Sequence, residues 1–199
     1  MTVACAVLHG LSGVLLAAFW WLYAIVLPFH RLREGIHHLA LDRNWTWISM
    51  IGGGGAILGS LALTLLWRLE PALAGTLGTA GVLVGSAGLS MLAGNLFWEA
   101  ILWPPLARHD ASVLSFSGPL YSSRTLLAFF GLAGLLFSGG FITVGLLLRD
   151  SFGIAGWCLA LGAPAFALGP LFGRYQVAVR SAGITALAAG QIAIASILL

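Results

Sequence analysis

Six apolar stretches constrain this chain more than any other feature, because each is long enough to cross a lipid bilayer as a helix. They cover residues 3–27, 46–67, 75–103, 125–148, 154–173 and 182–199. Hydrophobic residues make up 60% of the 199 residues and charged residues only 8%, whereas soluble domains carry about 25% charged residues. In lipid, segments of this kind satisfy their backbone groups internally as helices. We therefore predict an all-α polytopic membrane protein of six transmembrane helices, forming a single domain over residues 1–199.

The arginines predict an orientation for these helices. Six crossings place both termini on one side of the membrane, and short cytoplasmic loops are enriched in basic residues. Only two arginines fall on the side of the termini, Arg68 and Arg149, whereas seven fall on the other side: Arg31, Arg33, Arg43, Arg108, Arg124, Arg174 and Arg180. We therefore expect a multi-pass protein of the cytoplasmic membrane with both termini outside the cytoplasm. The net charge is +3, and the sequence contains no run of basic residues, so no nucleic-acid partner is expected.

Small residues recur along two of the predicted spans. The second span contains the run Gly52–Gly55 and Gly59, and the third contains Gly81 and Gly85, followed by Ser86, Ser90 and Gly94. Small residues at four-residue spacing allow two helices to approach closely in a membrane. The pattern predicts close packing within the bundle, or against other membrane chains or a second copy of this chain.

The third span carries Asn95 and Glu99, the strongest candidates for chemistry. Glu99 is a carboxylate within an otherwise apolar segment, and Asn95 lies four residues earlier on the same helical face. An ionisable group at membrane depth is costly and is by default a functional hypothesis: a proton carrier, a cation ligand or an anchor for a polar substrate. The alternative is a structural ion pair with Arg108 or Arg124. We expect the Trp103-Pro-Pro sequence to end this helix, about one turn beyond Glu99.

The predicted ligand or proton site extends into the connector of residues 104–124. Its predicted members are Asn95, Glu99, Arg108, His109, Asp110 and Arg124. Tryptophans near this site and in the first span are expected to pack or to anchor the interface; the alternative for Trp20, Trp21, Trp98 and Trp103 is that they line a pocket for a lipophilic molecule. Ser122 or Ser123 is expected to cap the following helix.

Residues 29–41 have a different pattern, typical of a short amphipathic helix lying on the membrane. On its polar face, the spacing of His30, Glu34, His37 and His38 permits a metal site, although a solvated polar face is the ordinary explanation. A bis-histidine haem is a further alternative, between His30 or His38 and His109, because His9 lies near the opposite face without a partner. No cofactor is strongly implied.

No catalytic signature occurs in the chain, which has no G-x-S-x-G, H-E-x-x-H or P-loop sequence. We therefore predict a membrane subunit or a helical bundle that binds a small ligand, without catalytic chemistry of its own. The alternative is a small proton-coupled transporter or channel that uses Asn95 and Glu99, with residues 104–124 as a cytoplasmic gate. A membrane metalloenzyme or haem protein using the histidines is a third hypothesis.

Overall fold

The computed structural model describes residues 1–28 and 35–199, and these residues form helices and connectors without any strand. The all-α prediction is therefore confirmed. The long helices are α1 (Thr2–Val26), α3 (Trp45–Leu69), α4 (Thr76–His109), α5 (Arg124–Phe152), α6 (Ile154–Leu168) and α7 (Gln176–Leu198). Within the described residues, four short helices connect them: α2 (His37–Ala40) and the 3-10 helices η2 (Pro71–Leu73), η3 (Ala111–Leu114) and η4 (Gly169–Tyr175).

Five segments of the described chain are long and apolar enough to cross a membrane, so the chain is a multi-pass membrane protein. Four of them are α1, α3, α4 and α5, and the fifth is the run Ile154–Leu198, which joins α6, η4 and α7. The backbone of this run turns at Gly173, where φ is 53°, and α6 and α7 then pack side by side. Six crossings require α6 and α7 to be counted separately, and that number stays a prediction.

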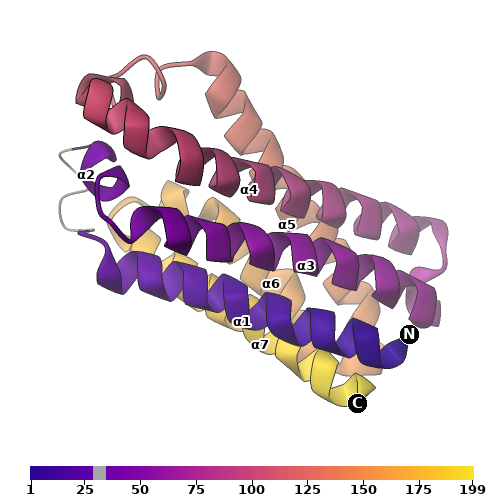
Figure 1. The fold of residues 1–199 in the computed structure, drawn as a ribbon. Helices are drawn as coiled ribbons and strands as arrows, with labels where there is room; N and C mark the ends of the chain where they lie inside the picture. Colours follow the sequence, from indigo (N-terminus) through magenta and orange to yellow (C-terminus); the bar gives the residue numbers. More distant parts are fainter. Residues whose placement is uncertain (29–34) are drawn as a thin grey trace.

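The long helices form a closed ring. Each packs against two neighbours in the order α1, α3, α4, α5, α6, α7, and α7 packs back on α1. Figure 1 shows both termini at the same end of this bundle, with α2 at the other end. We call the end with α2, η3 and η4 the loop end.

Glycines allow the close approaches in the ring that the small-residue spacing predicts. A Cβ on Gly55 would lie 3.1 Å from the backbone nitrogen of Leu16 in α1, and a Cβ on Gly140 of α5 would overlap the backbone of Gly85 in α4. The later positions of the third span differ, because Ser90 and Gly94 are exposed on the outside of α4. A Cβ added at Gly94 would meet nothing within 4 Å among the described residues, so no other helix packs closely at that position.

Helix α4 does not end at the two prolines, contrary to prediction, but continues through Pro104 and Pro105 to His109. A proline inside a helix leaves the carbonyl four residues earlier without its donor. Here that carbonyl belongs to Ala100, and the hydroxyl of Thr46 in α3 donates a hydrogen bond to it at 3.2 Å. A neighbouring helix thus supplies the donor that the proline removes, which membrane helices require.

The segment predicted as an amphipathic helix is only partly described, because residues 29–34 lie outside the described residues. The described remainder contains one helical turn, α2, and Ile36, Leu39 and Ala40 are buried in the hydrophobic core. The cap predicted for the fourth span is confirmed: the Ser123 hydroxyl accepts a hydrogen bond from the backbone of Leu126 at the start of α5.

Candidate functional site

Asn95 and Glu99 form a hydrogen-bonded pair on α4. The side-chain Nδ2 of Asn95 donates to Oε1 of Glu99 at 2.6 Å, which is a short, charge-assisted contact when the carboxyl is ionised. The four-residue spacing on one helix makes this pair possible. Because the amide nitrogen faces the carboxylate, the amide oxygen, Oδ1, faces away from it, and Oδ1 is buried without a hydrogen-bond partner in the described structure.

The pair lies deeper than the sequence predicts. With α4 extended to His109, Glu99 is ten residues from the end of the helix, or roughly 15 Å along its axis. Asn95 lies about one turn further in, near the middle of a helix of 34 residues. The prediction of a site about one turn from the end assumed that the prolines stop the helix, and that assumption is wrong.

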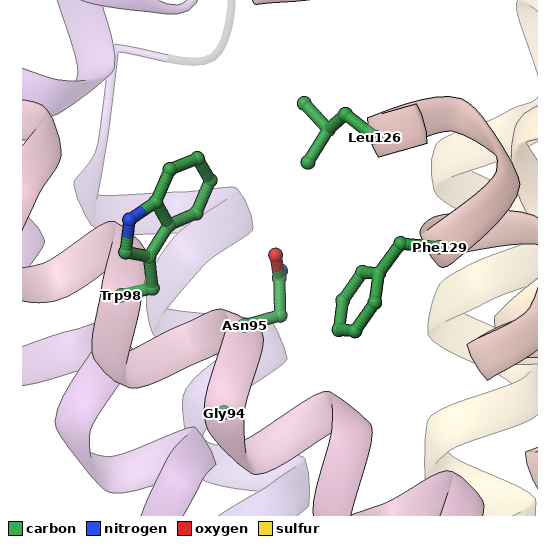
Figure 2. A pocket seen from close by; sticks show the side chains of 5 residues that line it. All are labelled: Gly94, Asn95, Trp98, Leu126 and Phe129. Atoms are coloured by element: carbon green, nitrogen blue, oxygen red, sulfur yellow. The ribbon is translucent and has the colours of Figure 1, made fainter. Parts of the chain in front are cut away.

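A cavity of about 230 Å³ lies beside this pair, between α4 and α5. Its walls are Gly94, Asn95 and Trp98 from α4 and Leu126 and Phe129 from α5. Figure 2 shows the Asn95 amide pointing into the space between Trp98, Leu126 and Phe129. Gly94 and Phe129 are exposed, so the cavity opens on the outer face of the bundle, where the hydrocarbon of a membrane would be.

The cavity exists because the first half of α5 stands away from its neighbours. No residue from Arg124 to Leu136 is buried, whereas buried positions begin at Phe137. In Figure 1 the start of α5 is separated from the bundle, and the helix joins it further along. The close contact of Gly85 with Gly140 holds the second half of α5 against α4, so the two helices diverge from that contact towards the loop end.

Three polar residues that the sequence analysis missed lie near Glu99. Arg180 at the start of α7, Tyr23 of α1 and Tyr121 of the connector before α5 all interact electrostatically with the Glu99 carboxylate. Burial raises the pKa of the Tyr121 phenol above its ordinary value of 10.0, so its hydroxyl stays protonated. Arg180, the described cation that acts on Glu99, belongs to α7, which lies opposite α4 in the ring.

Arg180 is held by aromatic rings rather than by a carboxylate. Its guanidinium lies 4.2 Å from the centroid of the Trp20 ring and 4.6 Å from that of Phe166, which are cation–π distances. Its Nε is buried and has no hydrogen-bond partner in the described chain. Arg149–Asp150 is the one arginine–carboxylate ion pair among residues 1–28 and 35–199, so the Glu99 carboxylate has no arginine in direct contact.

Aromatic rings form a cluster beside the backbone of Glu99, towards the loop end. The indole of Trp45 donates to the backbone oxygen of Glu99 at 3.0 Å. Its ring stacks on Trp103 with centroids 5.5 Å apart, and Trp103 in turn packs against Trp98 and Tyr121. The hydrogen bond from Trp45 and the packing of these rings hold the backbone of α4 at Glu99.

The remaining members of the predicted ligand site lie apart from the pair. Arg108, His109, Asp110 and Arg124 are all exposed at the loop end. Asp110 has a local role instead, because its carboxylate accepts hydrogen bonds from the backbone and the hydroxyl of Ser112 at the start of η3. These bonds lower the pKa of Asp110 below its ordinary value of 3.8.

The predicted metal site is only partly described, because His30 and Glu34 lie outside the described residues. The ring centroids of His37 and His38 lie 4.0 Å apart, and both residues are partly buried. In the described residues no group of three or more His, Cys, Asp or Glu side chains has a geometry that could hold a metal. His9, the histidine set apart from the others, is buried in α1.

Comparisons of the chain with protein-family models, with curated proteins and with solved structures give no match. The function is therefore inferred from the chemistry of the site. The described chain combines an intramembrane carboxylate, an amide oxygen without a partner and an apolar cavity beside it.

Proposed function

We propose that this protein binds a small lipophilic ligand in the cavity between α4 and α5, without catalytic chemistry of its own. The observation that supports the proposal most directly is the unpartnered Oδ1 of Asn95 at a cavity with otherwise apolar walls. Ligand sites typically combine apolar walls with a few well-placed polar groups that orient the ligand. Asn95 supplies the polar group, and Glu99 holds the amide in a fixed orientation.

The position of the cavity favours a ligand that arrives from the membrane. Its opening lies on the outer face of α4 and α5, beside exposed apolar residues such as Leu127 and Phe129. A lipophilic molecule already dissolved in the bilayer can enter there directly.

A proton-coupled transporter is the second candidate. It is favoured by the position of Glu99, which is bonded to Asn95 beside the cavity and interacts electrostatically with Arg180 on the far side of the ring. A carboxyl group placed between a ligand cavity and an interior cation can exchange a proton when the ligand binds. For this candidate we expect Glu99→Gln to abolish ligand-coupled proton movement while the protein remains folded.

The membrane and the orientation belong to the same proposal. Of the seven arginines expected in the cytoplasm, five are described, and Arg43, Arg108 and Arg124 are among them at the loop end. This distribution supports a cytoplasmic membrane with the loop end inside and both termini outside. Assembly with other membrane chains or as a homo-oligomer is also proposed, through the outer face of α4 around the exposed Ser90, which does not line the cavity.

The test of ligand binding is photolabelling in lipid nanodiscs with a dodecyl chain that carries a diazirine. The proposal predicts labelled peptides that contain Trp98 and Phe129, the aromatic walls of the cavity. Gly94→Leu should abolish this labelling, because Gly94 has open space around it and a leucine there would fill the cavity without displacing another helix.

Gly139→Leu is the matched control. Gly139 is also an exposed helical glycine with nothing within 4 Å of an added Cβ, but it does not line the cavity. We expect it to label like the unmodified protein. Equal labelling of the two variants and the unmodified protein would show that the probe samples the lipid-facing surface at large, and the proposal would be wrong.

A further inference from the structure

We propose that the ligand of the α4–α5 cavity is a lipophilic cation, an amphiphile whose head group is a protonated amine. This inference rests on the proposed ligand-binding function and specifies the chemistry of the head group. It follows from three features of the cavity: its hydrogen-bond capacity, its aromatic walls and the charge behind it.

The unpartnered polar atom that Asn95 offers to a ligand is a hydrogen-bond acceptor. The side-chain nitrogen of Asn95 already has a partner in the Glu99 carboxylate, whereas Oδ1 has none, and Oδ1 is a carbonyl oxygen that accepts hydrogen bonds and cannot donate them. A ligand satisfies it only by donating an N–H or an O–H. Donation by the amide to a carboxylate also polarises the amide and makes its oxygen a stronger acceptor.

The walls of the cavity favour a positive head group over a neutral one. Trp98 and Phe129 present aromatic rings on its two sides, and the faces of such rings attract ammonium groups. Aliphatic Leu126 and the bare backbone at Gly94 leave room for an alkyl chain towards the outer face.

The charge of Glu99, behind Asn95, also favours a positive head group. Glu99 has no arginine in contact within the described residues, because the one arginine–carboxylate ion pair there is Arg149–Asp150. Arg180, the cation that acts on Glu99 from a distance, is already sandwiched against Trp20 and Phe166. An ammonium group hydrogen-bonded to Asn95 would therefore be separated from the Glu99 carboxylate only by the Asn95 amide, and that carboxylate has no arginine in contact with it. An anionic head group would meet repulsion there.

The experiment is competition against the photoreactive dodecyl probe by three ligands with the same chain, in nanodiscs of phosphatidylcholine. Dodecylammonium carries charge and N–H donors, dodecyltrimethylammonium carries charge without a donor, and dodecanol carries a donor without charge. Concentrations are expressed per mole of lipid, so that different partitioning into the bilayer does not enter the comparison.

Dodecylammonium should displace the probe at a concentration about tenfold lower than dodecanol does, the difference expected between a charged and a neutral hydrogen bond. Dodecyltrimethylammonium should fall between them, since it cannot donate to Asn95. In Glu99→Gln the preference for dodecylammonium over dodecanol should shrink to about twofold or less. Asn95→Leu, the variant to use if Glu99→Gln does not fold, should remove the advantage of dodecylammonium over dodecyltrimethylammonium.

The outcomes separate the inference from the proposed function. If dodecanol displaces the probe as well as dodecylammonium does, and Gly94→Leu still blocks labelling, the cavity binds neutral lipophiles and the inference is overturned while the function stands. A preference for the amine that is unchanged in Glu99→Gln also overturns it. If no competitor displaces the probe and Gly94→Leu labels normally, the ligand site itself is refuted.

Discussion

Gly140→Ala tests the contact that holds α5 against α4. A Cβ at this position would overlap the backbone of Gly85 and would lie 2.9 Å from the carbonyl oxygen of Gly81. Both neighbours are backbone atoms in the middle of a helix, so neither can turn aside as a flexible side chain does. The helices would have to move apart by roughly 1 Å to restore ordinary van der Waals contact.

The size of the effect follows from what this separation exposes. Phe137, Phe141 and Val144 of α5 are buried in the core beside the contact, and all three would lose packing together. Overpacking in a core costs about 1 to 3 kcal/mol, and a backbone-to-backbone overlap belongs at the upper end of that range. We expect Gly140→Ala to lower the free energy of unfolding by about 3 kcal/mol.

Two controls make the comparison specific. A Cβ on the facing residue, Gly85, meets Leu63 at 3.4 Å and Gly140 at 3.6 Å, which is ordinary contact, and Gly139 has nothing within 4 Å. Gly85→Ala and Gly139→Ala should both change the stability by less than about 1 kcal/mol, with a gain at Gly139 from the helix propensity of alanine.

The assay is equilibrium unfolding in mixed micelles of a mild detergent and dodecyl sulfate, followed by tryptophan fluorescence and circular dichroism. The prediction requires Gly140→Ala to stand apart from both controls. If all three alanine variants unfold together with the unmodified protein, α4 and α5 are not in the close contact described, and the account of why they diverge towards the loop end is refuted as well.

Further predictions concern the loop end. Thr46→Val removes the donor to the carbonyl left free by the first proline of α4 and should destabilise the protein by about 1 kcal/mol, whereas Thr64→Val, which loses only a bond within its own helix, should have a smaller effect in the same assay. Hydrogen bonds from Ser112 lower the pKa of Asp110 in the folded protein. The ionised carboxylate should therefore stabilise the η3 turn fully at pH values above 3.8, and this stabilisation should be lost as the pH falls through the lower pKa of the folded state. Carbon-13 NMR of the aspartate carboxyls should show the low pKa, and Ser112→Ala should raise it; an unchanged pKa would contradict the assigned hydrogen bonds. Ser123→Ala should cost about 0.5 to 1 kcal/mol by removing the cap of α5, measurable as faster amide exchange in its first turn.

Much of the fold follows from the sequence because hydrophobic length and small-residue spacing are local signals. The long helices lie where the apolar stretches predict them, and Ser123 caps α5 as expected. Gly52, Gly55 and Gly59 mark a close approach to α1, as their spacing indicates. The end of α4 was not predictable in this way. Whether a proline ends a helix depends on whether another helix supplies the missing donor, and Thr46 is distant in sequence.

The polar pair was also predictable, but its surroundings were not. Asn95 and Glu99 share a face because of their spacing, and they bond each other as that spacing allows. Arg108 and Arg124, the cations nearest in sequence, are exposed. A pairing of Glu99 with either of them was favoured only by assuming a helix that ends at Pro104. With the helix continued, proximity along the chain no longer indicates proximity to the carboxylate.

Arg180 had a signal that the sequence analysis did not use. It stands four, seven and eleven residues before Ile184, Leu187 and Gln191, all of which are buried. This spacing places the arginine on the inward face of α7, whereas treating it as a loop residue hid that periodicity. What periodicity cannot supply is its partner, because the aromatic rings that hold it come from α1 and α6.

Glu99 is hydrogen-bonded to Asn95 and interacts electrostatically with Arg180. The substitution Glu99→Gln can therefore distinguish the two functional candidates. Glu99→Gln can keep the hydrogen bond with Asn95, and hence the orientation of the amide towards the cavity, but it removes the charge that acts on Arg180. A binding module should therefore retain neutral lipophiles and lose only its preference for cations. A transporter should retain binding but lose proton movement. Loss of all binding in a folded Glu99→Gln protein would contradict both, because it would make the carboxylate itself part of the cavity wall.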